Sequence, residues 1–254
     1  MRRVLNWLLV LSIGMVLLFG GLLYHTYQKS RITDTTLLEL NAALYQNPVQ
    51  EKEGRVDDVS IQIIFYTSID QTTLQDVVIE ILHCKDQKLT YLSVPTDTDI
   101  IVNSRLYQKL TALYPEMPQY FRLNQLPQLF DAKKRYGYAQ LVLDSMLSID
   151  SSYYTVIAGD ESTYQEYREA LWKQYEDRSK VGIEQLLKSE YPKTTSNLSK
   201  KNKVRYAKYY AEITEENITL GEVYGTRHTD SFEIDVVKFG VQMYQLQSGE
   251  PLSM

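Results

Sequence analysis

The segment LTYLSVPTDTDI, Leu89 to Ile100, joins a buried-strand pattern to side chains that could do chemistry at its end. After the apolar run it presents Pro95, Thr96, Asp97 and Thr98 in a row. A carboxylate at this point suits the rim of an active site. An acid at a plain strand end, by contrast, solvates a loop or caps a helix. The residues that surround Asp97 in the fold therefore decide between the two interpretations.

The other reactive residue types exclude several kinds of site. Cys84 is the single cysteine, which rules out an intramolecular disulfide and a cysteine-based zinc site. Its apolar neighbours in VVIEILHC favour a buried thiol. The histidines, His25, His83 and His228, are scattered without metal-ligand spacing. The formal net charge of −5 and the lack of a basic stripe argue against a nucleic-acid partner.

The N-terminal segment Leu5 to Tyr24 carries no charged residue. As a helix rising about 1.5 Å per residue it would cover the roughly 30 Å hydrocarbon core of a bilayer. A cleavable signal peptide is the competing interpretation, because Arg2 and Arg3 precede the run. The run is longer than the usual apolar region of about 7 to 15 residues, and no small-x-small cleavage site follows it. We predict a single uncleaved span in the plasma membrane, with a cytoplasmic N-terminus and an extracytoplasmic bulk.

This interpretation divides the chain into four parts. Residues 1–28 form the cytoplasmic tip and transmembrane anchor. Residues 29–58, which include a polar stretch with Pro48 and Gly54, read as a stalk with a short helix. Residues 59–247 form one extracytoplasmic domain, long enough to bury a substantial core, and residues 248–254 form a tail.

Three runs rich in β-branched and aromatic residues open this domain and predict strands. They are Val59–Ser68, Asp76–Cys84 and Lys88–Pro95. Only the turn KDQ separates the last two, so they should form an antiparallel hairpin.

The later sequence alternates helical and strand-like patterns, which predicts an α/β fold with a mixed sheet flanked by helices on both faces, an α/β/α arrangement. Further strands are expected at 99–102, 153–158, 218–225 and 232–237. Helices are expected at 104–114, 126–134, 138–147, 162–177, 181–189 and 200–212.

The order of these elements resembles the LytR-CpsA-Psr (LCP) family. In that domain a strand ends near an Asp, a short loop ends in Arg-Ser-Asp, and the hairpin closes on Ser-Ile-Pro-Arg-Asp-Thr. The last motif is similar to Ser93-Val94-Pro95-Thr96-Asp97-Thr98. RYGYAQLVLDSMLSIDSSYYTVI, from Arg135, resembles the next section of the family. The segment Ser189 to Gly225 resembles the late section, with a Thr-x-Asn-Leu-Ser helix entry. The resemblance covers most of the chain.

What the resemblance implies is an extracytoplasmic enzyme that moves a glycopolymer, of the teichoic acid or capsule type, from polyprenyl pyrophosphate to peptidoglycan. Asp97 matches the acid of the last motif and is the implied catalytic residue. Asp70 and Asp76 match the earlier acids and are the implied metal ligands. The implied cofactor is Mg²⁺ held together with a phosphorylated lipid, because Mg²⁺ usually shares carboxylates with substrate phosphates.

The arginines of the family motifs are missing from this sequence. Thr72, Leu74 and Thr96 stand where the motifs carry arginine. Arginine forks bidentately onto phosphate oxygens, so their loss should remove most activity. Arg227 is one replacement candidate as a phosphate ligand, and Arg205 is another.

Three hypotheses follow. The first is a degenerate family member, a pseudoenzyme of the Gram-positive envelope that binds polyprenyl-linked phosphate or regulates an envelope protein partner. The second is an active glycopolymer phosphotransferase with unusual cations. The third is an unrelated anchored α/β domain. The plain structural interpretation of Asp70, Asp76 and Asp97 is that acids at strand ends solvate loops or cap helices.

Overall fold

The computed structural model describes residues 49–159, 194–210 and 212–248. The chain divides into two compact units, Met1–Val49 and Gln50–Met254, and the fold below is that of the second. The expected membrane span, Leu5 to Tyr24, and the helices expected at 162–177 and 181–189 lie outside the described residues. Within the described part, none of the helices has the length and hydropathy that a bilayer crossing requires.

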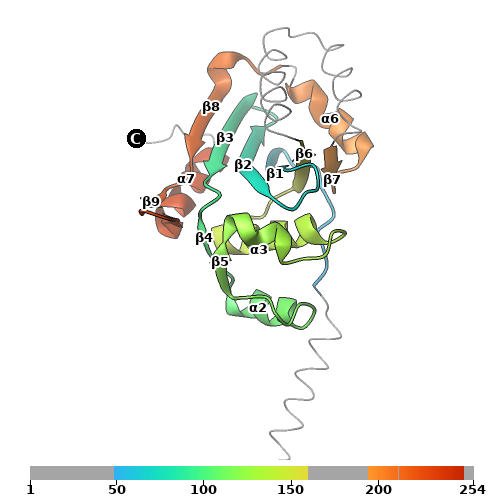
Figure 1. The fold of residues 1–254 in the computed structure, drawn as a ribbon. Helices are drawn as coiled ribbons and strands as arrows, with labels where there is room; N and C mark the ends of the chain where they lie inside the picture. Colours follow the sequence, from blue (N-terminus) through green and yellow to red (C-terminus); the bar gives the residue numbers. More distant parts are fainter. Residues whose placement is uncertain (1–48, 160–193, 211, 249–254) are drawn as a thin grey trace, which may run out of the picture. The chain divides into compact units, whose positions relative to one another are not determined.

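A mixed sheet with the strand order β7-β6-β1-β2-β3-β8 forms the centre of the unit (Figure 1). The predicted hairpin is confirmed, because β2 and β3 pair antiparallel from Val77 opposite Val94 to His83 opposite Lys88. Strand β1 pairs antiparallel with β2 and parallel with β6, while β3 pairs parallel with β8. The strands of this sheet are β1 (Val59–Thr67), β2 (Leu74–His83), β3 (Lys88–Val94), β6 (Tyr153–Ala158), β7 (Thr194–Ser196) and β8 (Ile218–Glu222).

Helices cover both faces of the sheet, as the sequence predicts. Two residues that are paired directly across neighbouring strands point to the same face of the sheet. The strand registers therefore show on which face each side chain lies. Phe65 packs against Tyr136 of α3 (Arg135–Leu147) with ring centroids 5.0 Å apart. On the same face, buried His83 contacts the Leu246 carbonyl of α7 (Val236–Ser248) at 2.5 Å. Glu80 points to the other face and accepts a hydrogen bond from Tyr210 of α6 (Lys200–Tyr210).

Smaller elements complete the described unit. Strand β4 (Asp99–Ile101) pairs antiparallel with β5 (Tyr120–Arg122), and β9 (Gly225–Arg227) pairs antiparallel with β10 (Phe232–Ile234). The remaining elements are α2 (Ser104–Thr111) and two short 3₁₀ helices, η1 (Leu123–Gln128) and η3 (Glu215–Asn217).

Two predictions about elements were wrong. The helix expected at 126–134 is absent, because η1 ends at Gln128 with Pro127 inside it and α3 begins only at Arg135. The strand expected at 232–237 stops at Ile234, where Asp235 caps a helix. The Asp235 carboxylate accepts the amide of Lys238 at 3.0 Å, and its carbonyl accepts the amide of Phe239 at 2.8 Å.

The core follows the predicted apolar runs. Ile63, Phe65, Val77, Ile79 and Leu92 have no exposed surface. Cys84 is the buried free thiol that its neighbours predict, and burial raises its pKa to about 11. A low-pKa thiolate is the reactive form of cysteine, so this residue is structural rather than reactive.

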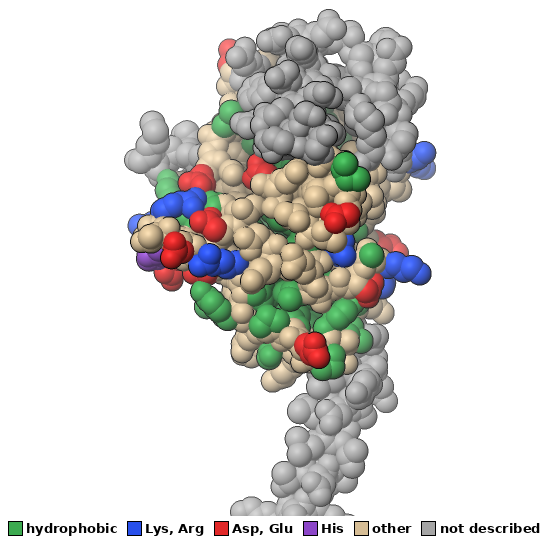
Figure 2. Space-filling view, in the orientation of Figure 1, with side chains coloured by type: hydrophobic (Ala, Val, Ile, Leu, Met, Phe, Trp, Pro, Cys, Tyr) green, Lys and Arg blue, Asp and Glu red, His purple; other side chains and the backbone are tan. Residues whose placement is uncertain are grey.

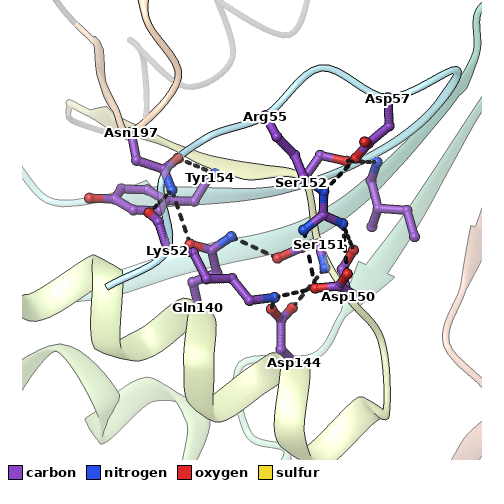
Figure 3. Close-up of polar contacts among 11 residues, drawn as sticks. Lys52, Arg55, Asp57, Gln140, Asp144, Asp150, Ser151, Ser152, Tyr154 and Asn197 are labelled. Carbon is purple, nitrogen blue, oxygen red and sulfur yellow. Dashed lines mark hydrogen bonds and ion pairs between the residues drawn. The ribbon is translucent and has the colours of Figure 1, made fainter. Parts of the chain in front are cut away.

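Part of the expected stalk packs onto the domain through a polar network (Figure 3). Lys52 pairs with Asp144 of α3 and with Asp150 at 2.6 Å, and Arg55 pairs with Asp150 at 2.8 Å. The Lys52 carbonyl also accepts the Asn197 amide at 2.9 Å. Residues 52–57 therefore tie α3 to the loop before β6 and to the segment that enters α6.

Candidate functional site

The predicted site residues lie at one edge of the sheet. Strands β1, β3, β6 and β8 run in the same direction, since β1 and β3 both oppose β2. Their carboxyl ends share one edge with the start of β2. Asp70 lies in the loop after β1, Asp76 at the start of β2, and Asp97 after β3. Ligands of open α/β sheets bind outside the carboxyl ends of strands, so this edge is the candidate site.

Asp70 is held by its own loop. Its carboxylate accepts hydrogen bonds from the Ser68 hydroxyl at 2.5 Å, the Thr72 hydroxyl at 2.8 Å and the Thr72 amide at 3.1 Å. These bonds, from Ser68 first and then Thr72, lower the pKa of Asp70, so it is ionised at neutral pH. The interactions are those of an acid that closes a tight turn.

Asp76 is the third residue of β2, which begins at Leu74 opposite Thr67 of β1. It stands opposite Tyr66, next to a register irregularity of β1, and its carboxylate accepts the Val77 amide at 2.8 Å. This local bond identifies Asp76 as a strand-start residue at the same edge as Asp70.

Asp97 meets Arg227, the residue that the sequence marked as a possible replacement cation. The Nη1 atom of Arg227 lies 2.7 Å from Oδ2 of Asp97, and Nη2 lies 3.7 Å from Oε1 of Glu222. The guanidinium carbon also lies 5.2 Å from the centre of the Phe232 ring. One half-exposed cation therefore stands between two carboxylates.

The fold brings Arg227 to Asp97 by two pairings. Strand β8 lies beside β3 with Glu222 opposite Ser93. The β9–β10 hairpin then returns to the turn after β3, where the Phe232 amide donates to the Asp97 carbonyl at 3.2 Å. Arg205, the other candidate, lies on α6, which covers one face of the sheet.

The turn that carries Asp97 is held by several hydrogen bonds. Thr98 is fully buried, and its hydroxyl and amide both donate to the Pro95 carbonyl, at 2.5 Å and 3.0 Å. The Thr96 carbonyl accepts the amide of Asn124 at 2.8 Å. Hydrogen bonds on both sides of Asp97 therefore hold the backbone that presents it, and Thr96, the residue before it, is partly exposed.

The three predicted acids do not converge. No group of three or more His, Cys, Asp or Glu side chains with metal-binding geometry occurs among the described residues, which include Asp70, Asp76 and Asp97. Asp70 and Asp97 are also occupied by hydrogen bonds and an ion pair. The described side chains thus do not fit a magnesium cage built by the protein alone.

Charged side chains of both signs gather around the β9–β10 hairpin (Figure 2). Besides Asp97, Glu222 and Arg227, His228 lies 3.4 Å from Glu233. Sequence analysis did not identify Glu222 as a site residue. An acid at the end of a strand pattern gives no indication of which arginine it will contact in the fold. This mixed surface differs from a basic anion-binding patch.

Comparisons with known proteins identify the fold. No family model matches the sequence, and no curated protein emerges as a relative. Among solved structures, TagV of B. subtilis is 9% identical, with 78% of this chain and 100% of that chain covered and a TM-score of 0.53. The gbs0355 protein of Streptococcus agalactiae is 12% identical, with 77% and 90% covered and a TM-score of 0.53.

A third structure, TagT bound to LI-WTA, is 12% identical, with 80% of this chain and 98% of that chain covered and a TM-score of 0.50. The chain has the LytR-CpsA-Psr fold. Asp97 lies in the turn that follows β3 (Lys88–Val94). At 9% to 12% identity, the likeness to these structures shows the fold alone.

Proposed function

We propose that this protein is a membrane-anchored, extracytoplasmic component of bacterial cell-envelope biogenesis that binds a polyprenyl-linked phosphate and transfers glycopolymer weakly or not at all. The observation that carries the weak-transfer part of the proposal is the pairing of Arg227 with both Asp97 and Glu222 at the strand ends. A cation placed between two carboxylates leaves the local charge negative, which disfavours tight capture of a diphosphate.

The LCP fold supports the general envelope role, and the structure of TagT bound to LI-WTA supports a glycopolymer or its lipid-linked form as the ligand class. Arginines at the motif positions would stabilise a phosphoryl-transfer transition state by a factor of about 10³ to 10⁵ in rate. Thr72, Leu74 and Thr96 cannot supply that charge. A binding or regulatory role, with an envelope protein as a further partner, therefore fits these residues better than catalysis.

We expect Mg²⁺ to bind only when a phosphorylated lipid is also bound. The acids do not form a cage of their own, and Mg²⁺ commonly combines one or two carboxylates with substrate phosphates. The anchor, Leu5 to Tyr24, and the extracytoplasmic location belong to the proposal on the strength of the sequence.

Glycopolymer transfer is the second candidate function. It is favoured by the presence of an arginine beside Asp97, whereas the negative charge balance around that arginine argues against it. A guanidinium and a carboxylate at the carboxyl end of a strand are parts that such a transferase needs. If a diphosphate displaced Asp97 from Arg227, the arginine would contact the leaving group and the acid would be free to act on the acceptor hydroxyl.

One experiment separates the two functions. The purified full-length chain in detergent is mixed with polyprenyl phosphate, and its melting temperature is recorded with and without Mg²⁺. In parallel, it is incubated with a lipid-linked glycopolymer and peptidoglycan, with TagT as the positive control. Stabilisation by the lipid without transfer supports the proposal. Transfer at a rate similar to that of TagT would refute it in favour of the transferase.

A further inference from the structure

Helix α7 has an apolar face on each of two sides. It lies beside β9 in Figure 1 and packs against β2 and α3. The side chains that it buries are Phe239, Gln242, Met243 and Leu246. On the opposite side, Val237, Val241 and Tyr244 follow helical spacing and are 79%, 56% and 69% exposed. Scattered exposed apolar residues are ordinary, but a row of them along one helix face indicates a contact surface. We call these three residues and Gly240, which lies among them, the α7 stripe.

Gly240 has no packing role within the described part of the chain. A Cβ built on it would have no neighbour within 4 Å, so no contact there requires a glycine. Glycine is unfavourable in the interior of a helix, and its presence in α7 therefore calls for another reason. A residue without a side chain leaves a notch on the helix surface, which lets a group from outside approach the backbone closely.

The α7 stripe carries no charge. Lys238, the one charged residue of α7, borders the stripe, and its Nζ atom lies 3.5 Å from Oδ2 of Asp235. An acidic or basic partner, or an anionic lipid surface, would find no opposite charge on the stripe itself. A copy of the same stripe, by contrast, meets it without repulsion between like charges.

We propose that two copies of this chain associate through the α7 stripe, with the two helices antiparallel about a twofold axis near Gly240. Tyr244 follows Gly240 by one helical turn, so this axis places the ring of each copy over Gly240 and Val237 of the other copy. Every stripe thus supplies one ring and one notch, and a twofold axis satisfies both pairs at once. The inference goes beyond the proposed function, because it requires neither lipid nor glycopolymer.

The size of the α7 stripe sets the strength of this dimer. Helix α7 has 13 residues, and at about 1.5 Å per residue it is roughly 20 Å long. One face of such a helix buries less than the roughly 800 Å² per partner of a standard interface. We therefore expect a reversible dimer with a dissociation constant between micromolar and millimolar. Two chains anchored in one membrane would meet at a higher effective concentration.

Sedimentation equilibrium of the full-length chain in density-matched detergent, from micromolar to millimolar concentrations, tests the dimer. Val241→Glu brings two like charges to the axis and should weaken association by about tenfold or more. Val204→Glu is the matched control, because Val204 is an equally exposed valine, at 53%, on α6. This second variant has the same change of charge and should dimerise like the wild type.

Gly240→Ala separates the dimer contact from the stability of the helix. The new methyl group fills the notch, so dimerisation should weaken several-fold. At micromolar concentration, where the monomer dominates, the same substitution should raise the melting temperature, because alanine favours the helix. A variant that merely damaged the fold would lower both quantities.

Cross-linking tests the antiparallel arrangement. Cys84 is the single native cysteine and is buried, so a cysteine added at the surface reports its own contacts. Oxidation of Val241→Cys with copper phenanthroline should give a disulfide-linked dimer, whereas Val204→Cys should remain monomeric.

Two results would overturn the inference. A wild-type chain that stays monomeric up to millimolar concentration would mean that α7 meets another protein, a lipid surface or only solvent. A dimer that Val241→Glu leaves intact would mean that association runs through a different surface. Neither result would refute the proposed function, whose test is the binding of polyprenyl phosphate.

Discussion

Arg227 Nη1 and Asp97 Oδ2 lie 2.7 Å apart although the two residues are 130 positions apart in the sequence. The pair joins the acid of the third-strand motif to a cation from a hairpin near the C-terminus. Both side chains are partly exposed, at 34% for Asp97 and 55% for Arg227, so the pair contributes less than about 1 kcal/mol to stability. The Arg227–Asp97 pair is therefore expected to affect ligand binding more than it affects stability.

Replacing Asp97 by Asn should strengthen binding of pyrophosphate. The substitution removes a negative charge from the site and releases Nη1 of Arg227, so we expect a gain of several-fold in affinity at low salt that shrinks as salt is added. Calorimetry at two salt concentrations measures both effects. If the protein is an active transferase, the same substitution should abolish glycopolymer transfer, because Asp97 would be needed for the reaction.

Asp86→Asn is the matched control for this substitution. Asp86 is an exposed acid in the turn between β2 and β3, at the other end of the sheet from Asp97. The same change of net charge at that distance should leave pyrophosphate affinity almost unaltered. Equal gains from both substitutions would show that overall charge, and not the Arg227 pair, controls binding.

Replacing Thr96 by Arg should also strengthen binding of a pyrophosphate-linked lipid, by about tenfold. Thr96 is partly exposed on the hydrogen-bonded turn before Asp97, so a long side chain can reach solvent there. The change restores a forked donor at the family position. Thr96→Lys, with the same charge and no fork, should give a smaller gain. Equal affinity of the arginine and lysine variants would argue against bidentate recognition.

The central sheet was predictable because its signals are local. The runs 59–68, 76–84 and 88–95 are rich in β-branched residues, and the KDQ turn leaves only a hairpin as the connection. Helix α7 was missed because Val236 and Val237 prolong the strand-like pattern of the preceding residues. Asp235 as the cap and buried Phe239, Met243 and Leu246 at helical spacing were the available signals.

The site was predictable only in part. The sequence and the family resemblance put Asp70, Asp76 and Asp97 at strand ends, and the topology gathers those ends at one edge. Whether side chains at one edge touch depends on loop conformation, which no local pattern encodes. In the structure, Asp70 bonds within its own loop, and the β9–β10 hairpin packs against the turn that carries Asp97. Arg135 donates to the Gln71 carbonyl in the loop after β1. None of these contacts could be read from the sequence.

Gly54 should be intolerant of any side chain. A Cβ built there would lie 2.7 Å from the Cα of Leu198 and 2.8 Å from the carbonyl oxygen of Asn197, and neither backbone atom can move aside easily. Gly54→Ala should therefore lower the free energy of unfolding by about 1 to 3 kcal/mol. Urea denaturation followed by circular dichroism measures the change.

Gly240→Ala is the matched control for Gly54→Ala. Gly240 is exposed on α7, and a Cβ there would have no neighbour within 4 Å. Alanine should stabilise this helix position by about 0.5 to 1 kcal/mol. A loss of stability of the same size in both variants would contradict the packing of residues 52–57 against Asn197 and Leu198.

Stability should fall as the pH rises from about 4.5 to about 7 because of Glu80. This side chain is buried beneath α6, and burial raises its pKa from 4.5 to about 7 against the hydrogen bonds of Tyr210 and Tyr91. The native state therefore holds a proton that the unfolded state has released in this interval. Its contribution is complete below about pH 4.5 and lost above about pH 7, and it amounts to at most about 3 kcal/mol.

Two variants test the assignment of this pH dependence to Glu80. Glu80→Gln keeps a neutral side chain that can still accept from Tyr210, so the fall in unfolding free energy between pH 5 and pH 8 should become smaller by the amount due to Glu80. Tyr210→Phe removes a donor that favours the carboxylate and should move the fall to higher pH. An unchanged pH profile in Glu80→Gln would mean that Glu80 is ionised in the native protein and that α6 packs over a charge.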